Sequence, residues 1–165
     1  MAGCWSGRID HVNCANDSRW SGETIGPSDL ALLLAVPEGI FDFPINPAQA
    51  AAFLSDPLHE IVVALNGDGV ILGMASARIM LHPDKPPAGF INELGVHEAH
   101  RRRGIARALC AELFAILRAH GCIGLWLATE HDNEPARGLY AKLDGRETGD
   151  IVVYDWDGAM DVVPD

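Results

Sequence analysis

The chain has 165 residues, of which 48% are hydrophobic, and its 12 basic and 23 acidic side chains give a formal net charge of −11. This length favours one domain with its own hydrophobic core. The acidity argues against nucleic acid as the main partner, and the lack of an apolar run of about 18 residues predicts no membrane span.

The first half of the chain predicts short strands and helices. Residues 1–18 show no hydrophobic period and no apolar h-region, so we expect a loose extension before a single domain over residues 19–165, without a secretory signal. Residues 20–25 indicate a first strand, and a helix should begin at Pro27. A second helix is expected over residues 46–55, with Asn46 as N-cap and Pro47 as its first residue.

The middle of the chain is rich in strand signals. Residues 61–65 indicate a buried strand, which the turn at residues 66–69 joins to a hairpin partner over residues 70–81. The prolines within residues 82–87 remove N–H donors and predict a stiff loop. A further strand over residues 90–96 follows.

The clearest element is an amphipathic helix over residues 104–120, which should end at Gly121. A buried strand over residues 123–128, a helix from Asn133 and a last strand over residues 151–156 complete the order. Because a helical crossover joins them, the strands on either side of the long helix should be parallel. The sequence therefore predicts an α/β (α+β) fold, with a mixed sheet and helices on both faces.

The junction between residues 90–96 and the long helix is a basic turn, in which Arg101, Arg102 and Arg103 precede Gly104. The first N–H groups of a helix lack intrahelical partners and lie at the positive end of its dipole, where anions bind. The glycine patterns of a Walker loop and of a dinucleotide-binding fingerprint are both absent. We therefore expect this turn to bind a phosphate or pyrophosphate group.

The pattern Arg101-x-x-Gly104-x-Ala106, between a strand and a long helix, resembles motif A (R/Q-x-x-G-x-G/A) of the GNAT superfamily of N-acetyltransferases. A second stretch, Asn133-x-x-Ala136-x-x-Leu139-Tyr140-x-Lys142-Leu143, is similar to the family motif N-x-x-A-x-x-x-Y/F-x-K-x-G-F, although Asp144-Gly145-Arg146 replaces its usual ending. The resemblance covers residues 21–156. It implies a mostly antiparallel sheet of six to seven strands with helices on both faces and a splayed central parallel pair.

Within the superfamily, four segments look most like aminoglycoside 3-N-acetyltransferases: residues 41–45, 82–86, 91–96 and 136–143. That resemblance implies a transferase that moves acetyl from acetyl-CoA to an amine on the deoxystreptamine ring of an antibiotic. Such an enzyme would confer antibiotic resistance.

The resemblance also implies how acetyl-CoA is held. Its pyrophosphate falls on the backbone of residues 101–106, where the three arginines add charge. In the family, this strand splays from its neighbour, so the main-chain groups of Leu94 and Val96 can bind the pantetheine arm. Gly95 suits a β-bulge at this position. The N–H of Val96 is a candidate for polarising the thioester carbonyl. The remaining cofactor-binding candidates are Gly104, Ile105, Ala106, Asn133 and Ala136.

Acetylation of an amine needs a base, because the amine arrives mostly protonated, and an acid for the departing thiolate. Glu93 is the candidate base, and should point to the opposite sheet face from Asn92 and Leu94. The alternative for Glu93 is a purely structural role in a hydrogen-bond network. Glu130 is the second candidate for the base. The resemblance makes Tyr140 the candidate acid, against a purely structural aromatic.

Acidic side chains are candidates for pairing with the ammonium groups of a substrate. They are Asp42, Asp84, Glu130, Asp150 and Asp155. For each of them, an ordinary solvated surface acid is the alternative. The acids concentrated near the end of the chain serve either solubility or the attraction of a polycation.

The cysteines and histidines suggest neither a disulfide framework nor a metal site. No Cys-x-x-Cys pair occurs, and no His/Cys set has zinc-ligand spacing, so reduced thiols in the cytoplasm and no metal are expected. Cys110 and Cys122 lie in apolar segments without a paired histidine, which favours direct transfer in a ternary complex over an acyl-enzyme.

Three functions stay open. The first is an aminoglycoside N-acetyltransferase, and the second is an acetyltransferase for another cation, such as a polyamine, a small metabolite or a protein lysine. The third is an acetyl-CoA-binding module without turnover. A homodimer is compatible with each of them.

Overall fold

The structure, a computed structural model, describes residues 9–11 and 20–154. These residues fall into two compact units, one that extends to Glu130 and one that begins at His131. The sheet belongs to the first unit, and helix α4 (Glu134–Ala141) belongs to the second. Within the described residues, no helix is both long enough and apolar enough to cross a membrane.

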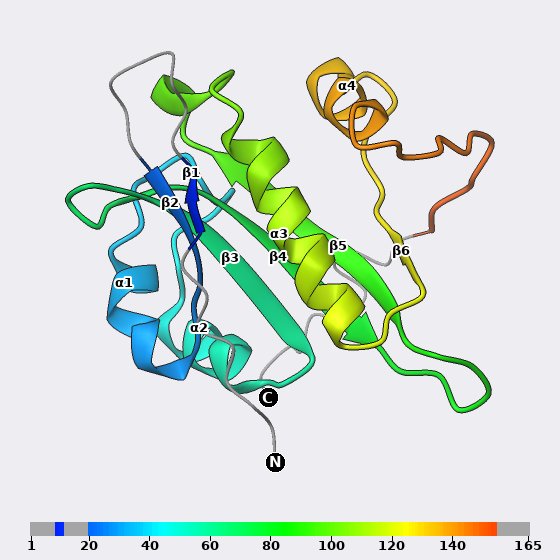
Figure 1. Cartoon of the computed structure of the whole chain (residues 1–165), viewed down its shortest axis with the longest axis horizontal. Helices are drawn as coiled ribbons and strands as arrows, with labels where there is room; N and C mark the ends of the chain where they lie inside the picture. The colour runs from blue at the N-terminus through cyan, green and yellow to red at the C-terminus, as the bar shows by residue number, and fades with distance from the viewer. Residues whose placement is uncertain (1–8, 12–19, 155–165) are drawn as a thin grey trace, which may run out of the picture. The chain divides into compact units, whose positions relative to one another are not determined.

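The first unit is built on a sheet of six described strands that lie side by side in chain order (Figure 1). The antiparallel strands are β1 (Ile9–His11), β2 (Trp20–Thr24), β3 (His59–Asn66), β4 (Ile71–Met80) and β5 (Ala88–Val96). Strand β6 (Gly124–Trp126) pairs with β5 in parallel. The predicted α/β class and the parallel pair around the long helix are therefore confirmed.

Helices cover both faces of this sheet, as predicted. Helix α1 (Leu30–Leu34), which follows the short 3-10 turn η1 (Pro27–Asp29), and α2 (Pro47–Ser55) cover one face, and α3 (Ile105–Ala119) covers the other (Figure 1). Successive residues of a strand point to opposite faces, so β3 contributes side chains to the hydrophobic cores on both faces of the sheet. Val62 packs in the core that contains Leu113 of α3, whereas Val63 packs in the core that contains Leu54 of α2.

Local sequence signals explain the helix and hairpin boundaries. The Asn46 side chain accepts hydrogen bonds from the N–H groups of Ala48 and Gln49, at 2.9 and 3.1 Å, and so caps α2 as predicted. Asn66 accepts from Val70 at 2.8 Å and closes the turn between β3 and β4. The N-cap glycine of α3, Gly104, adopts a φ of 83°.

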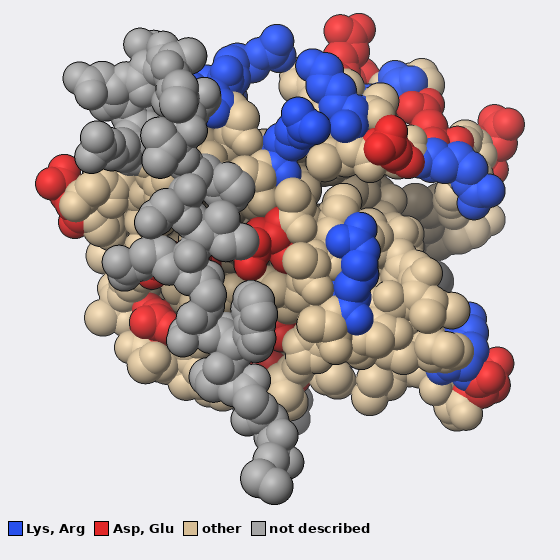
Figure 2. Space-filling model, in the orientation of Figure 1, with Lys and Arg blue, Asp and Glu red and all other residues tan. Residues whose placement is uncertain are grey.

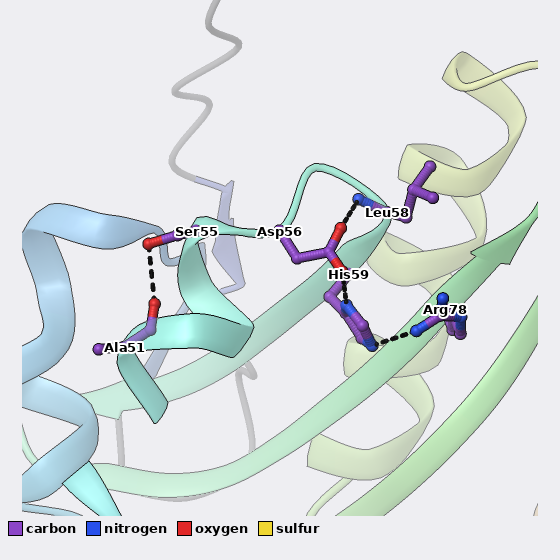
Figure 3. Close-up of polar contacts among 6 residues, drawn as sticks. All are labelled: Ala51, Ser55, Asp56, Leu58, His59 and Arg78. Carbon is purple, nitrogen blue, oxygen red and sulfur yellow. Dashed lines mark hydrogen bonds and ion pairs between the residues drawn. The ribbon is translucent and has the colours of Figure 1, made fainter. Parts of the chain in front are cut away.

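A polar cluster joins the end of α2 to the sheet (Figure 3). Asp56 accepts a hydrogen bond from the N–H of Leu58 at 2.9 Å, and its other oxygen lies 3.0 Å from Nδ1 of His59. Nη1 of Arg78 lies 3.1 Å from Nε2 of the same ring. Because arginine only donates, this Nε2 must be the accepting nitrogen. The bond from Leu58 is the main cause that lowers the pKa of Asp56.

Three predictions about strands are wrong. Ile9–His11 forms β1, where a loose extension was expected, because its backbone pairs with the edge of β2. The strand after α3 has three exposed residues rather than a buried run. Residues 151–154 have no regular structure, and the rest of that predicted strand lies outside the described residues. The parallel pair therefore lies at the edge of the described sheet and not at its centre.

Candidate active site

The basic turn after β5 has the geometry of an anion site. The chain passes from β5 through the turn η2 (Glu98–His100) to three exposed arginines and then to Gly104. Gly104 lies in the left-handed region, where a side chain would be strained, and Arg102 does so as well, with a φ of 63°. No side chain caps α3, and its first N–H groups have no intrahelical partner.

Positive charge adds to these N–H groups. Figure 2 shows Lys and Arg side chains gathered where α3 begins in Figure 1. The rings of His97 and His100, which flank the turn, have centroids 5.7 Å apart. Burial, followed by the charges of Arg103 and His97, lowers the pKa of His100, so that this ring is neutral at pH 7. The guanidinium groups of the arginines therefore supply the positive charge of the turn.

The Arg101 side chain has a structural task that the sequence did not indicate. Its Nε donates to the carbonyl of Val96 at 3.0 Å and so fastens the turn to the end of β5. The N–H of His97 donates to the carbonyl of Leu72 on β4 at 2.9 Å. These two bonds fix where the strand ends relative to the start of α3.

The splayed edge that the resemblance implied is present beside β5. Strand β6 pairs only with Ala88, Gly89 and Phe90, so β5 continues past the end of its parallel neighbour. Because His97 bonds to β4, alternation along the strand directs the main-chain groups of Leu94 and Val96 to the opposite edge. The Val96 carbonyl accepts the Arg101 bond on that edge, toward which the Val96 N–H also points.

The β-bulge of β5 lies at Asn92 and not at Gly95. Consecutive residues of β4, Ser76 and Ala77, pair with Glu93 and Ile91, so Asn92 is the extra residue. Gly95 stays in register and is needed for a different reason. A Cβ at this position would overlap the carbonyl oxygen of Ile40 and would lie 3.0 Å from the carbonyl carbon.

Glu93 faces away from Leu94, as expected, and therefore away from the long helix. Ile91 and Leu94 both pack against the core of α3, and Glu93 lies between the bulge and Leu94 with its side chain on the other face. The side chain is more than a third exposed. Partial burial and the negative charge of Asp42 raise the pKa of Glu93. Two carboxylates that interact in this way favour a cation between them.

The other acidic candidates lie on different segments of the chain. Asp84 lies in the loop before β5, whose first residue, Ala88, is five residues before Glu93. Glu130 is exposed at the end of the first unit. Asp150 is an exposed residue of the second unit with a φ of 59°, and Asp155 lies outside the described residues.

The second unit carries the candidate acid, Tyr140, on α4. Asn133 accepts a hydrogen bond from the N–H of Ala136 at 3.3 Å and caps this helix. Arg137 forms a two-bond ion pair with Glu147, at 3.2 and 2.9 Å, which holds the segment after α4 against the helix. This pair lowers the pKa of Glu147, and the sequence did not indicate it.

The alternative nucleophiles are poorly suited to chemistry. Cys110 is fully buried, and burial raises its pKa to about 11, so the thiol stays protonated at neutral pH. The His59 ring beside Asp56 already uses its Nε2 in the contact with Arg78. No group of three or more His, Cys, Asp or Glu suited to a metal ion occurs among the described residues.

Comparisons with known proteins agree with this geometry. Residues 31–145 match the model of the acetyltransferase (GNAT) family. An acetyltransferase of Pectobacterium atrosepticum is 44% identical over 97 residues, which are 59% of this chain and 63% of the relative. The matched stretches span 42% to 63% of the length of the curated relatives that they align with.

Solved structures share the fold. An aminoglycoside acetyltransferase from an uncultured soil metagenomic sample superposes with a TM-score of 0.70 at 26% identity, covering 83% of this chain and 97% of that one. The aminoglycoside acetyltransferase AAC(6')-Iy, in complex with a bisubstrate analogue of CoA and acetylneamine, superposes with a TM-score of 0.71 at 20% identity. That superposition covers 83% of this chain and 97% of the other.

Proposed function

This chain belongs to the GNAT acetyltransferase family, and from that premise we propose that it transfers the acetyl group of acetyl-CoA to an amine of an aminoglycoside. The position we propose is the 3-amine of the deoxystreptamine ring. Transfer is direct, within a ternary complex of protein, acetyl-CoA and amine.

Each step has a named residue. The turn at residues 101–106 binds the pyrophosphate of acetyl-CoA, and the N–H of Val96 polarises the thioester carbonyl. Glu93 removes one proton from the substrate ammonium, and the amine nitrogen then forms a bond to the carbonyl carbon as the C–S bond breaks. Tyr140 gives its phenolic proton to the departing thiolate of CoA, and the second proton that the nitrogen loses as the amide forms restores the phenol.

The observation that carries the proposal is the electrostatic interaction of Glu93, on the strand beside the splayed edge, with the carboxylate of Asp42. Partial burial, followed by the negative charge of Asp42, raises the pKa of Glu93, which brings this carboxylate closer to the range of a useful base. The neighbouring Phe43 is 83% exposed, and an aromatic face attracts cations. This combination suits an acceptor with more than one ammonium group, as an aminoglycoside has.

The competing acceptor is another cationic amine, such as a polyamine or a protein lysine. The same Glu93–Asp42 pair would attract any primary ammonium group, which makes this second function a real alternative.

A thiol-release assay separates these functions. Acetyl-CoA is mixed with gentamicin-type and neomycin-type aminoglycosides, with spermidine and with a lysine peptide, and NMR identifies the acetylated nitrogen of each product. We expect release with aminoglycosides and acetylation at the 3-amine. Release with spermidine alone would establish the second function, and CoA binding without release for any amine would indicate a non-catalytic module.

A further inference from the structure

The segment over residues 39–45, here named the acceptor loop, lies between α1 and α2 and approaches β5 closely at Gly95. Its Ile40 side chain is buried in the core between α1, α2 and the sheet. The Ile40 carbonyl occupies the space that a side chain at Gly95 would fill. Backbone therefore meets backbone here, with no side chain between the loop and the strand.

We propose that this contact positions the acceptor loop on β5, so that Gly95 is a positioning residue that sets where Asp42 stands relative to Glu93. The inference rests on the proposed role of Glu93 as the base.

The spacing along both segments supports this role. Asp42 lies two residues beyond Ile40, and Glu93 lies two residues before Gly95 on the same sheet face. A methyl group at position 95 would overlap the carbonyl, so either the loop or the strand must shift. Since β5 is held by its pairs with β4 through this region, the loop is the part that moves.

The surroundings of Glu93 make the movement measurable. Its partner across the strand pair is Ser76, which does not titrate, and α3 lies on the other face of the sheet. Among the charged groups of the described residues, Asp42 is the one whose charge acts on Glu93. Displacing the loop therefore weakens the repulsion between the two carboxylates and lowers the pKa of Glu93.

The test is the titration of the Glu93 carboxyl group, followed by 13C NMR in the full chain. Asp42→Asn should move the Glu93 midpoint to lower pH, because it removes the like charge. Gly95→Ala should move it in the same direction, and the double variant should move it no further than Asp42→Asn does. A merely structural effect of Gly95→Ala would leave the midpoint unchanged.

Gly89→Ala is the matched control, because it adds a methyl to a glycine of the same strand. That methyl meets the end of the Leu117 side chain at 2.8 Å, on the face away from Glu93, so the Glu93 midpoint should not move. If Gly95→Ala does not fold, Ile40→Ala loosens the same contact from the loop side and should give the same downward shift.

The titration needs no turnover, so its outcome is separate from that of the thiol-release assay. An unchanged midpoint in folded Gly95→Ala, or in Ile40→Ala, would overturn the proposal, as would an unchanged midpoint in Asp42→Asn. In the active enzyme, the proposal also requires Gly95→Ala to raise the KM for the amine more than the KM for acetyl-CoA.

Discussion

The direction in which Glu93 points depends on one extra residue. In a regular strand, Ile91, Glu93 and Gly95 would share a face, and Glu93 would point at the core of α3 together with Ile91. The bulge at Asn92 breaks this alternation. Alternation predicted that Glu93 faces away from both Leu94 and Asn92. It is correct for Leu94, but the bulge interrupts the alternation at Asn92, and no local signal predicted the bulge, because its position depends on the pairing with β4.

Replacing Glu93 by Gln tests its role as base. The ionised carboxylate is the active form, and its pKa is raised, so activity should fall with decreasing pH earlier than for an ordinary glutamate. Glu93→Gln should reduce kcat about 100-fold and remove this acid limb. The measurement is the pH dependence of thiol release, with the exposed surface variant Glu38→Gln as control. An unchanged acid limb in Glu93→Gln would assign the base to another group.

The buried thiol of Cys110 should take no part in the reaction. Because burial raises its pKa to about 11, the folded protein should not react with iodoacetamide at this residue at pH 7.5 or so. Mass spectrometry of labelled peptides measures this, with urea-unfolded protein as the positive control. An acetyl group found on Cys110 after incubation with acetyl-CoA would contradict direct transfer.

At the scale of elements, strong local signals gave correct predictions. Two of these signals are asparagine side chains that bond to nearby backbone N–H groups, Asn46 before Pro47 and Asn66 in the hairpin turn. The third is Gly121 after α3, whose own backbone adopts a positive φ. The strand after α3 was less predictable. Its apolar residues indicated burial, yet Trp126 is 53% exposed, because burial depends on which segments cover a strand and not on its composition.

The cap of α2 offers a direct test at this scale. Asn46→Ala removes the acceptor of two backbone N–H groups and should lower the free energy of unfolding by about 1 kcal/mol. Urea denaturation measures the loss. Asn46→Ser, which keeps a capping oxygen, should retain most of the stability, and equal stability of the alanine variant and the original protein would show that the cap contributes nothing.

At the scale of the whole molecule, two short motifs predicted the family and the class of fold, and they place the proposed anion site at the turn after β5. They act through local geometry: a strand end, a left-handed glycine and a helix start. The pairing of Glu93 with Asp42 was beyond such reasoning. It depends on the packing of the acceptor loop against Gly95, which only the folded chain brings about.

The central claim is that the turn after β5 binds the phosphates of acetyl-CoA. An NMR titration of the 15N-labelled protein with CoA tests this claim most directly. We predict that the amide signals of residues 102–106 shift together as CoA is added, and that raising the ionic strength weakens the binding. Saturation with CoA that shifts amides elsewhere and leaves these signals in place would contradict the account.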